Sequence, residues 1–222
     1  MDNTVIDRNQ TPVGMPRIGS PAPPFEAVTT HGALKLEDFK GSWLILFSHP
    51  ADFTPVCTTE FIGFAEIHPK LREMNVELMG LSIDSVYSHI AWARNIEEKL
   101  GKKITFPIIA DLNKEVATLY GMIMPGESKT ETSRAVFVID DKQIVRAIIY
   151  YPLSTGRNMD EILRLLQALQ AHDKHNVATP ANWRPGDKVI IPTPQTQEAA
   201  EQRVKEKGMD CKDWYFCKKD LK

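Results

Sequence analysis

Five short apolar runs alternate with segments of helical periodicity, and this alternation constrains the fold more than any other feature of the chain. The runs lie at residues 42–48, 76–83, 106–110, 135–139 and 144–150. Runs that are almost wholly apolar are typical of strands buried on both faces of a sheet. The sequence therefore predicts an α/β fold in which helices cover both faces of a central sheet. A polar turn at 140–142 separates the last two runs, so we expect a hairpin there and a mixed sheet.

Helices are expected between and after these runs. The predicted segments are 55–74, 85–100, 113–119, 160–171 and 197–207. In the first of them, four apolar side chains recur at spacings of three and four, which is the period of a helix face. Residues 11–25 carry five prolines and are expected to be extended, because proline fixes φ and removes a backbone donor.

The composition changes after His172, where prolines and charged residues become frequent. We predict a main domain over 1–172 and a C-terminal extension over 173–222. The extension is too short to form an independent core. It is expected to pack as an arm on the main domain or on a partner subunit.

Charge and hydropathy exclude several classes of function. The formal net charge of the 222-residue chain is −2 and no basic stripe stands out, which argues against nucleic-acid binding. No apolar run approaches the ~20 residues of a membrane span. The N-terminus is polar and lacks the apolar stretch of a signal peptide, so we expect a cytoplasmic protein with no membrane partner. Three cysteines are a poor disulfide framework.

Cys57 is the candidate nucleophile. Thr54 suits the N-cap and Pro55 the first position of the predicted helix, which places Cys57 in the first turn. Unpaired backbone N–H groups and the positive end of the helix dipole favour the thiolate form there. The alternative is an unreactive buried cysteine. The next residues are T-T-E, so the C-x-x-C pair of a thioredoxin-type disulfide oxidoreductase is absent.

The segment around Cys57 carries a resemblance to a known family. Residues 50–57 read P-A-D-F-T-P-V-C and match the P-x-x-x-T-x-x-C signature of peroxiredoxins. From about residue 18 to 192 the chain resembles the peroxiredoxin-6 (1-Cys) subfamily, through L-S-I-D-S-V, F-P-I-I-A-D, Y-Y-P-L-S-T-G-R-N-M-D-E-I-L and V-A-T-P-A-N-W-R-P-G-D. The resemblance implies a thioredoxin-like fold and an antioxidant thiol peroxidase that uses no cofactor or metal.

The resemblance also implies roles for individual residues. Cys57 would be oxidised to a sulfenic acid by hydrogen peroxide or an organic hydroperoxide. Pro50 would shield it, and the Thr54 hydroxyl would bind the peroxide. Arg134 would hold the thiolate and the peroxide oxygens, as a permanent cation with several donors can. The alternative for Arg134 is a cap at the end of a strand on the surface.

Two further residues match the subfamily near the site. Arg157 resembles its second arginine, although pairing with acidic groups of the helix that starts at Asp160 is an alternative. His49 resembles a histidine close to the cysteine, and a satisfied histidine at a strand terminus is the alternative.

Cys211 and Cys217 resemble a C-terminal pair of archaeal and some bacterial relatives. By that resemblance, Cys217 attacks the Cys57 sulfenic acid, on the neighbouring subunit, and Cys211 then exchanges with Cys217. The alternative order has Cys211 as the first attacking thiol. Two idle thiols in an unstructured tail, or a zinc site with His172 or His175, are the alternatives.

The resemblance implies a homodimer, with a homodecamer of five dimers as the larger assembly, and thioredoxin or another thiol as reductant. A redox-dependent chaperone or sensor is the competing function. No feature of the sequence identifies the preferred peroxide or the physiological reductant.

Overall fold

The computed structural model describes residues 15–206 and 209–221. Contacts divide the chain into two compact units, Met1–Arg157 and Asn158–Lys222. The division falls before the helix that starts at Met159, whereas the sequence analysis placed its boundary after His172. The boundary after His172 stays a prediction.

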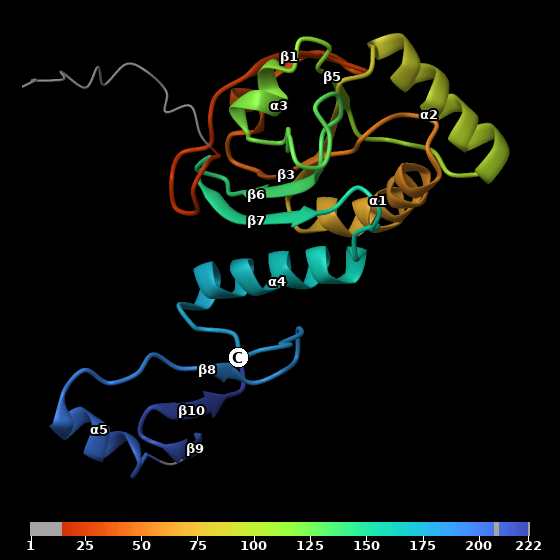
Figure 1. Cartoon of the computed structure of the whole chain (residues 1–222). Helices are drawn as coiled ribbons and strands as arrows, with labels where there is room; N and C mark the ends of the chain where they lie inside the picture. Colours follow the sequence, from red (N-terminus) through yellow and green to blue (C-terminus); the bar gives the residue numbers. More distant parts are fainter. Residues whose placement is uncertain (1–14, 207–208, 222) are drawn as a thin grey trace, which may run out of the picture. The chain divides into compact units, whose positions relative to one another are not determined.

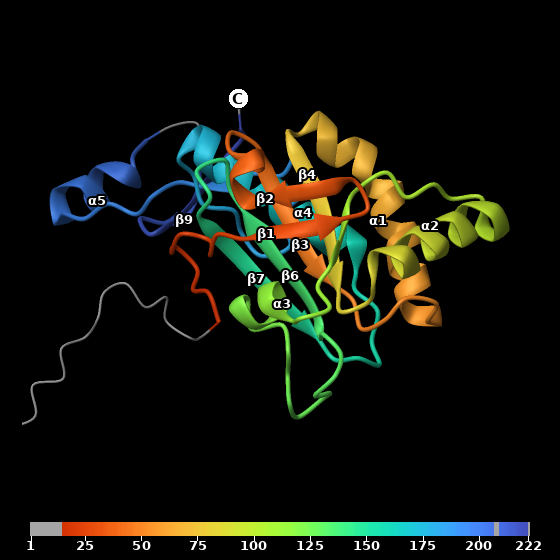
Figure 2. The same ribbon diagram turned by 90° about the horizontal axis from the view of Figure 1, so that it is seen from above.

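The first unit contains a seven-stranded sheet in the order β2-β1-β5-β4-β3-β6-β7. Its strands are β1 (Glu26–Thr29), β2 (Gly32–Lys35), β3 (Trp43–Ser48), β4 (Val76–Ser82), β5 (Ile108–Ala110), β6 (Arg134–Ile139) and β7 (Val145–Tyr151). Strands β3, β4 and β5 are parallel, while β6 runs antiparallel to β3. Figure 2 looks onto this sheet, with its strands side by side.

The predicted hairpin and the mixed sheet are confirmed, because β6 and β7 pair antiparallel. The five predicted strands are all present, with ends shifted by one or two residues. Strands β1 and β2, which pair with each other, were not predicted. Their residues are largely exposed, so they lack the continuous apolar run that marks a central strand.

Alternate residues of β3 point to opposite faces of the sheet. Leu44 and Leu46 belong to a core that includes Val116 and Ala117 of α3 (Glu115–Leu119). Phe47, on the other face, stacks on Phe64 with ring centroids 3.9 Å apart. Phe64 belongs to α1 (Pro55–Glu73), so α1 and α3 lie on opposite sides of the sheet (Figure 1). The predicted α/β layering is confirmed.

A serine caps the second long helix of this unit. Ser85 caps α2 (Val86–Leu100) by accepting a hydrogen bond from the Ser88 backbone N–H. Trp92 of α2 is buried and lies 4.5 Å, centroid to centroid, from Phe61 of α1. Trp92 is therefore a core residue. A single 3₁₀ turn, η1 (Leu36–Phe39), follows β2.

The second unit has its own small core. It contains α4 (Met159–His175), β8 (Val189–Ile190), α5 (Gln197–Arg203), β9 (Asp210–Asp213) and β10 (Phe216–Lys219). Ala168, Val177, Trp183 and Val189 form the core, and β8, β10 and β9 pair in that order as an antiparallel sheet. These three strands were not expected from the sequence, so the prediction of an extension without strands is wrong. Among the described helices, none combines the length and apolarity needed to cross a bilayer.

Candidate active site around Cys57

Cys57 lies at the third position of α1, in its first turn. Thr54 is the N-cap residue and Pro55 the first helical residue, as predicted. The backbone N–H groups of a first turn have no carbonyl partner within the helix. Cys57 is a free cysteine and its side chain is fully buried. The sulfur therefore sits at the positive end of a helix and is shielded from bulk water.

Arg134 is the cation next to this sulfur. It is the first residue of β6 and is 3% exposed, so the alternative of a surface cap is wrong. Its Nη1 lies 3.4 Å from Cys57 Sγ and donates to Glu60 Oε2 at 2.6 Å. Its Nε and Nη2 both donate to the carbonyl oxygen of Leu153, at 3.0 and 2.8 Å. The guanidinium is thus fixed on two sides while one nitrogen faces the sulfur.

Arg157 anchors Glu60 and makes no hydrogen bond to Cys57 among those described. Its Nε donates to Glu60 Oε1 at 2.9 Å and its Nη2 to Oε2 at 2.7 Å. Its Nη1 donates to the carbonyl oxygens of Ser48 and Ala135.

The guanidinium carbon of Arg157 lies 5.3 Å from the ring centroids of Phe47 and Phe64. The structure places Arg157 beside Arg134, on a shared carboxylate, rather than on the acidic residues of α4.

Glu60 is ionised between the two arginines. Burial alone would raise the pKa of Glu60, but the charge and hydrogen bonds of Arg157, with the charge of Arg134, outweigh it and lower the pKa. Burial lowers the pKa of Arg157, although Glu60 opposes that shift. One carboxylate between two guanidinium groups leaves net positive charge beside the Cys57 sulfur.

His49 lies at the end of β3, fully buried, in a chain of buried polar groups. Its Nε2 is 2.9 Å from Asp52 Oδ1, and Asp52 Oδ2 is 2.8 Å from Nδ1 of His89. Its ring lies 4.7 Å, centroid to centroid, from Phe61, which is one turn after Cys57 on α1. Nδ1 of His49 has no hydrogen-bond partner within the described residues. His49 is thus tied to a network, and one of its ring nitrogens is left to accept a further hydrogen bond.

Asp52 carries the charge of this network. Burial raises its pKa, but hydrogen bonds from His49 and His89 outweigh burial and hold the pKa far below its usual range. Burial lowers the pKa of His49, so its ring is neutral near pH 7. His89 Nε2 is 3.1 Å from the carbonyl oxygen of Ile109, which can only accept. Both ring nitrogens of His89 therefore face acceptors.

Within the described part of the chain, His49, Asp52 and His89 form a cluster whose atoms could in principle bind a metal ion. Their ligand atoms lie within 4.8 Å of one another. The closest of these atoms are only 2.8 and 2.9 Å apart, which are hydrogen-bond distances. Each of these atoms already has a partner, so the arrangement fits proton sharing better than an ion. The absence of a metal at the site stays a prediction.

Pro50 and Thr54 lie in the turn that precedes Cys57 and α1. Pro50 is buried, and Thr54 is half-buried with its Oγ1 donating to the carbonyl oxygen of Ala51 at 2.9 Å. The Thr54 hydroxyl therefore does not cap the helix and keeps its acceptor capacity. Phe53 has φ 56°, in the left-handed region, which a bulky residue adopts at a cost of ~1–3 kcal/mol. The turn before α1 is thus held in a strained conformation.

Cys211 and Cys217 lie in the second unit and are joined by a disulfide. They face each other across the β9–β10 hairpin. The alternatives of idle thiols in an unstructured tail and of a zinc site with His172 or His175 are wrong for these two sulfurs. The implied exchange between Cys211 and Cys217 is compatible with this bond, and the implied attack of Cys217 on Cys57 stays a prediction.

Sequence reasoning missed three residues of the site, Glu60, Asp52 and His89. Glu60 follows Cys57 by three positions, so the helical period alone places both side chains on one face of α1. Asp52 and His89 lie 37 positions apart, and their contact depends on the packing of α2. A sequence signal was therefore available for Glu60 but not for the Asp52–His89 pair.

Two family models match the chain. Residues 18–148 match the AhpC/TSA family, and residues 168–207 match the C-terminal domain of 1-Cys peroxiredoxin. A peroxiredoxin of Aquifex aeolicus is 58% identical over 220 residues, which cover 94% of this chain and 99% of the relative. One from Methanocaldococcus jannaschii is 55% identical over 217 residues, 93% of this chain and 100% of the relative.

Solved structures show the same fold. The yeast mitochondrial 1-Cys peroxiredoxin is 41% identical with a TM-score of 0.81 and matches 93% of this chain and 100% of its own. A cysteine-to-serine mutant of peroxiredoxin 6 of Arenicola marina is 36% identical with a TM-score of 0.84, over 93% of this chain and 98% of its own. The predicted thioredoxin-like fold is confirmed.

Proposed function

Because the chain belongs to the peroxiredoxin family and is a peroxidase, we propose that Cys57 reduces hydrogen peroxide and organic hydroperoxides through a sulfenic acid. One observation carries the proposal. Nη1 of Arg134 lies 3.4 Å from Cys57 Sγ, in the first turn of a helix. A positioned cation and a helix N-terminus stabilise both a thiolate and the charge that develops on a leaving oxygen.

The oxidation step uses the Cys57 sulfur, Arg134 and the residues around them. The Cys57 thiolate attacks one peroxide oxygen, and an S–O bond forms as the O–O bond breaks. The electron pair of the O–O bond goes to the second oxygen, which takes a proton and leaves as water or an alcohol. Arg134 stabilises that oxygen, the Thr54 hydroxyl binds the peroxide, and Pro50 excludes water. Arg157 acts through Glu60 by fixing the position of Arg134.

His49 has a supporting part in the proposal. Its unpartnered Nδ1 is a buried acceptor near the Phe61 face of α1. Such an atom can accept a hydrogen bond from the peroxide or from the sulfenic hydroxyl. Asp52 holds the ring in place through Nε2.

The cycle is completed by the C-terminal cysteines. Cys217 of a neighbouring subunit attacks the Cys57 sulfenic acid and releases water. Cys211 then attacks Cys217, which frees Cys57 and leaves the Cys211–Cys217 disulfide. That bond in the second unit supports this order of events. A thioredoxin-like donor reduces it, in a cytoplasmic homodimer or a decamer of five dimers that protects against oxidative stress.

Replacement of Cys57 by serine tests the peroxidase step. The Cys57→Ser protein is expected to consume hydrogen peroxide no faster than a protein-free mixture of the same thiol. The matched control is Cys211→Ser/Cys217→Ser, which keeps Cys57 and is expected to consume one peroxide per subunit in a single burst. Unchanged turnover in Cys57→Ser would refute the proposal.

A further inference from the structure

The two sulfurs of the C-terminal disulfide are unequally exposed. Cys211 belongs to β9, which pairs only with β10 among the described strands and so forms an edge of the small sheet. Cys217 belongs to β10, between β8 and β9. Cys211 is half-buried, whereas Cys217 is 1% exposed. A nucleophile from solvent therefore reaches one sulfur of the pair far more readily than the other.

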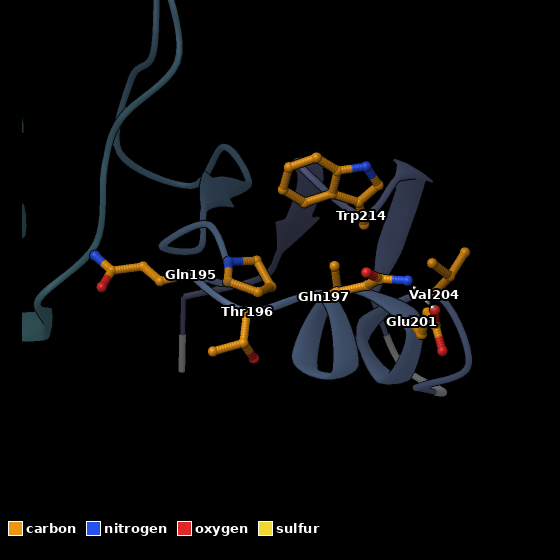
Figure 3. A pocket seen from close by; sticks show the side chains of 8 residues that line it. Gln195, Thr196, Gln197, Glu201, Val204 and Trp214 are labelled. Atoms are coloured by element: carbon orange, nitrogen blue, oxygen red, sulfur yellow. Dashed lines mark hydrogen bonds between the residues drawn. The ribbon is translucent and has the colours of Figure 1, made fainter.

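The fold of the second unit maintains this difference. Lys218 and Lys219 of β10 pair with β8, which fixes the strand that carries Cys217. Nζ of Lys188 lies 3.3 Å from Asp210 Oδ2, at the start of β9. Trp214, in the turn between β9 and β10, lines a groove of about 460 Å³ together with residues of α5 (Figure 3). The hairpin is thus held by contacts at both of its strands.

We propose that the external thiol which reduces this disulfide attacks Sγ of Cys211, and that Cys217 is always the leaving sulfur. The inference rests on the proposed cycle, because it concerns the disulfide with which that cycle ends. It assigns different tasks to the two cysteines. Cys211 receives the reductant, and Cys217 is returned as the thiol that meets the next sulfenic acid.

Reduction of the Cys211–Cys217 disulfide consumes two molecules of the external thiol. The first thiolate forms a bond to Cys211 Sγ while the Cys211–Cys217 bond breaks, and its electron pair leaves on Cys217 Sγ. Cys217 takes a proton from water. A second thiolate then attacks the mixed disulfide at the sulfur of the first thiol and releases Cys211. The reductant is oxidised to its disulfide by two electrons, and both cysteines are reduced.

The surroundings of Cys217 can hold its thiol once it has been released and protonated. Its Sγ lies 3.4 Å from the carbonyl oxygen of Asp213. Once Cys217 is protonated, its S–H can donate to that oxygen. The released thiol is then held buried in the hairpin until the next cycle. Attack on Cys217 instead would require the reductant to enter a position that is almost closed to solvent.

Mapping of the first adduct tests the proposal. Cys57→Ser protein, oxidised with diamide to form the C-terminal disulfide, is mixed briefly with glutathione and quenched with excess N-ethylmaleimide. Trypsin separates the two cysteines, since residues 208–212 give GMDCK and residues 213–218 give DWYFCK. Mass spectrometry then reads which peptide carries glutathione and which carries maleimide.

We expect glutathione on GMDCK in at least about tenfold excess over DWYFCK. The matched control is the same protein in guanidinium chloride, where the two peptides should carry similar amounts. Equal labelling of the folded protein, or an excess on DWYFCK, would overturn the proposal. Because Cys57 is absent from this protein, the result is separate from the test of peroxidase activity.

A second measurement covers the case in which rapid reclosure leaves too little adduct to map. In Cys57→Ser/Cys217→Ser the remaining thiol is Cys211, and in Cys57→Ser/Cys211→Ser it is Cys217. The Cys211 thiol is expected to react with 5,5′-dithiobis(2-nitrobenzoate) about tenfold faster or more. The difference should disappear in guanidinium chloride. Equal rates in the folded proteins contradict the proposal.

Discussion

Arg157 donates three hydrogen bonds to Glu60, from its backbone N and Nε to Oε1, both at 2.9 Å, and from Nη2 to Oε2 at 2.7 Å. The same Oε2 accepts from Nη1 of Arg134 at 2.6 Å. A carboxylate that the sequence motif does not single out therefore sets the position of the cation at Cys57. Both the stability of the main unit and the geometry of the site depend on it.

Glu60→Gln is expected to lower the free energy of unfolding by about 3–5 kcal/mol, because it removes the only charge that the described structure places between the two buried guanidinium groups. It should also slow sulfenic acid formation, since Arg134 loses a fixed partner. Urea unfolding and stopped-flow oxidation measure the two effects. An unfolding free energy within about 0.5 kcal/mol of the unsubstituted protein would contradict the assignment of Glu60.

Glu66→Gln is the matched control on the same helix. Glu66 pairs with Lys102 at 3.1 Å, but both side chains are largely exposed. Exposed pairs contribute about 0–1 kcal/mol, so this variant should keep both its stability and its peroxidase rate. The contrast separates a buried shared carboxylate from a surface ion pair.

Arg134→Met is expected to slow the reaction of Cys57 with hydrogen peroxide by about 10²–10³-fold, the usual loss when one donor to a developing oxyanion is removed. Arg134→Lys should also be slow, because an ammonium cannot hold Leu153 and Glu60 and still face the sulfur. Stopped-flow tryptophan fluorescence under single-turnover conditions gives the rate. Arg72→Met, at an exposed arginine of α1, is the control and should leave the rate unchanged.

Acid is expected to unfold the protein through the buried charges of the site. The pKa values of Asp52 and Glu60 are lowered in the folded chain, so the unfolded chain binds protons more tightly. The stabilisation is complete above their usual pKa values of about 4 and is lost as the pH falls below them. The pKa of His49 is also lowered in the folded chain, so the unfolded chain takes up this proton first. The free energy of unfolding therefore begins to fall below about pH 6.5. Urea midpoints should therefore decline from about pH 6.5 and fall steeply below about pH 4.

Asp52→Asn isolates one of these groups. Below about pH 4 the slope of unfolding free energy against pH should be shallower by up to about 1.4 kcal/mol per pH unit, the contribution of one proton. Asp141→Asn, at an exposed side chain, serves as the control with an unchanged slope. Identical slopes for Asp52→Asn and the unsubstituted protein would show that Asp52 takes up no proton on unfolding.

If Cys217 attacks the Cys57 sulfenic acid of a neighbouring subunit, treatment with peroxide should give a reducible dimer band on a non-reducing gel. The band joins Cys57 of one subunit to Cys217 of another and should accumulate in Cys211→Ser, because the exchange that removes it is blocked. It should be missing from Cys217→Ser. If Cys217→Ser gives the band and Cys211→Ser does not, the roles of the two cysteines are reversed.

The sequence alone determined the order of the five apolar strands and the helices between them in the main unit, and the placement of Cys57. Both are local properties. The apolar runs of strands, the period of helices and the Thr54–Pro55 start of α1 depend only on residues that are close in the sequence. The resemblance carried by the P-x-x-x-T-x-x-C signature and the other separated motifs added the family and the role implied for Arg134. The exposed strands β1 and β2 were missed because they carry no such pattern.

Tertiary structure decided which charges meet at the sulfur. Arg134 and Arg157 lie 74 and 97 positions from Glu60. The pairing of β3 with β6 and of β6 with β7 brings these segments together. The exposure of Cys211 and the burial of Cys217 likewise follow from which strand of the small sheet is central. Sequence spacing fixes neighbours along a helix or strand, whereas burial and long-range ion pairs depend on how the elements pack.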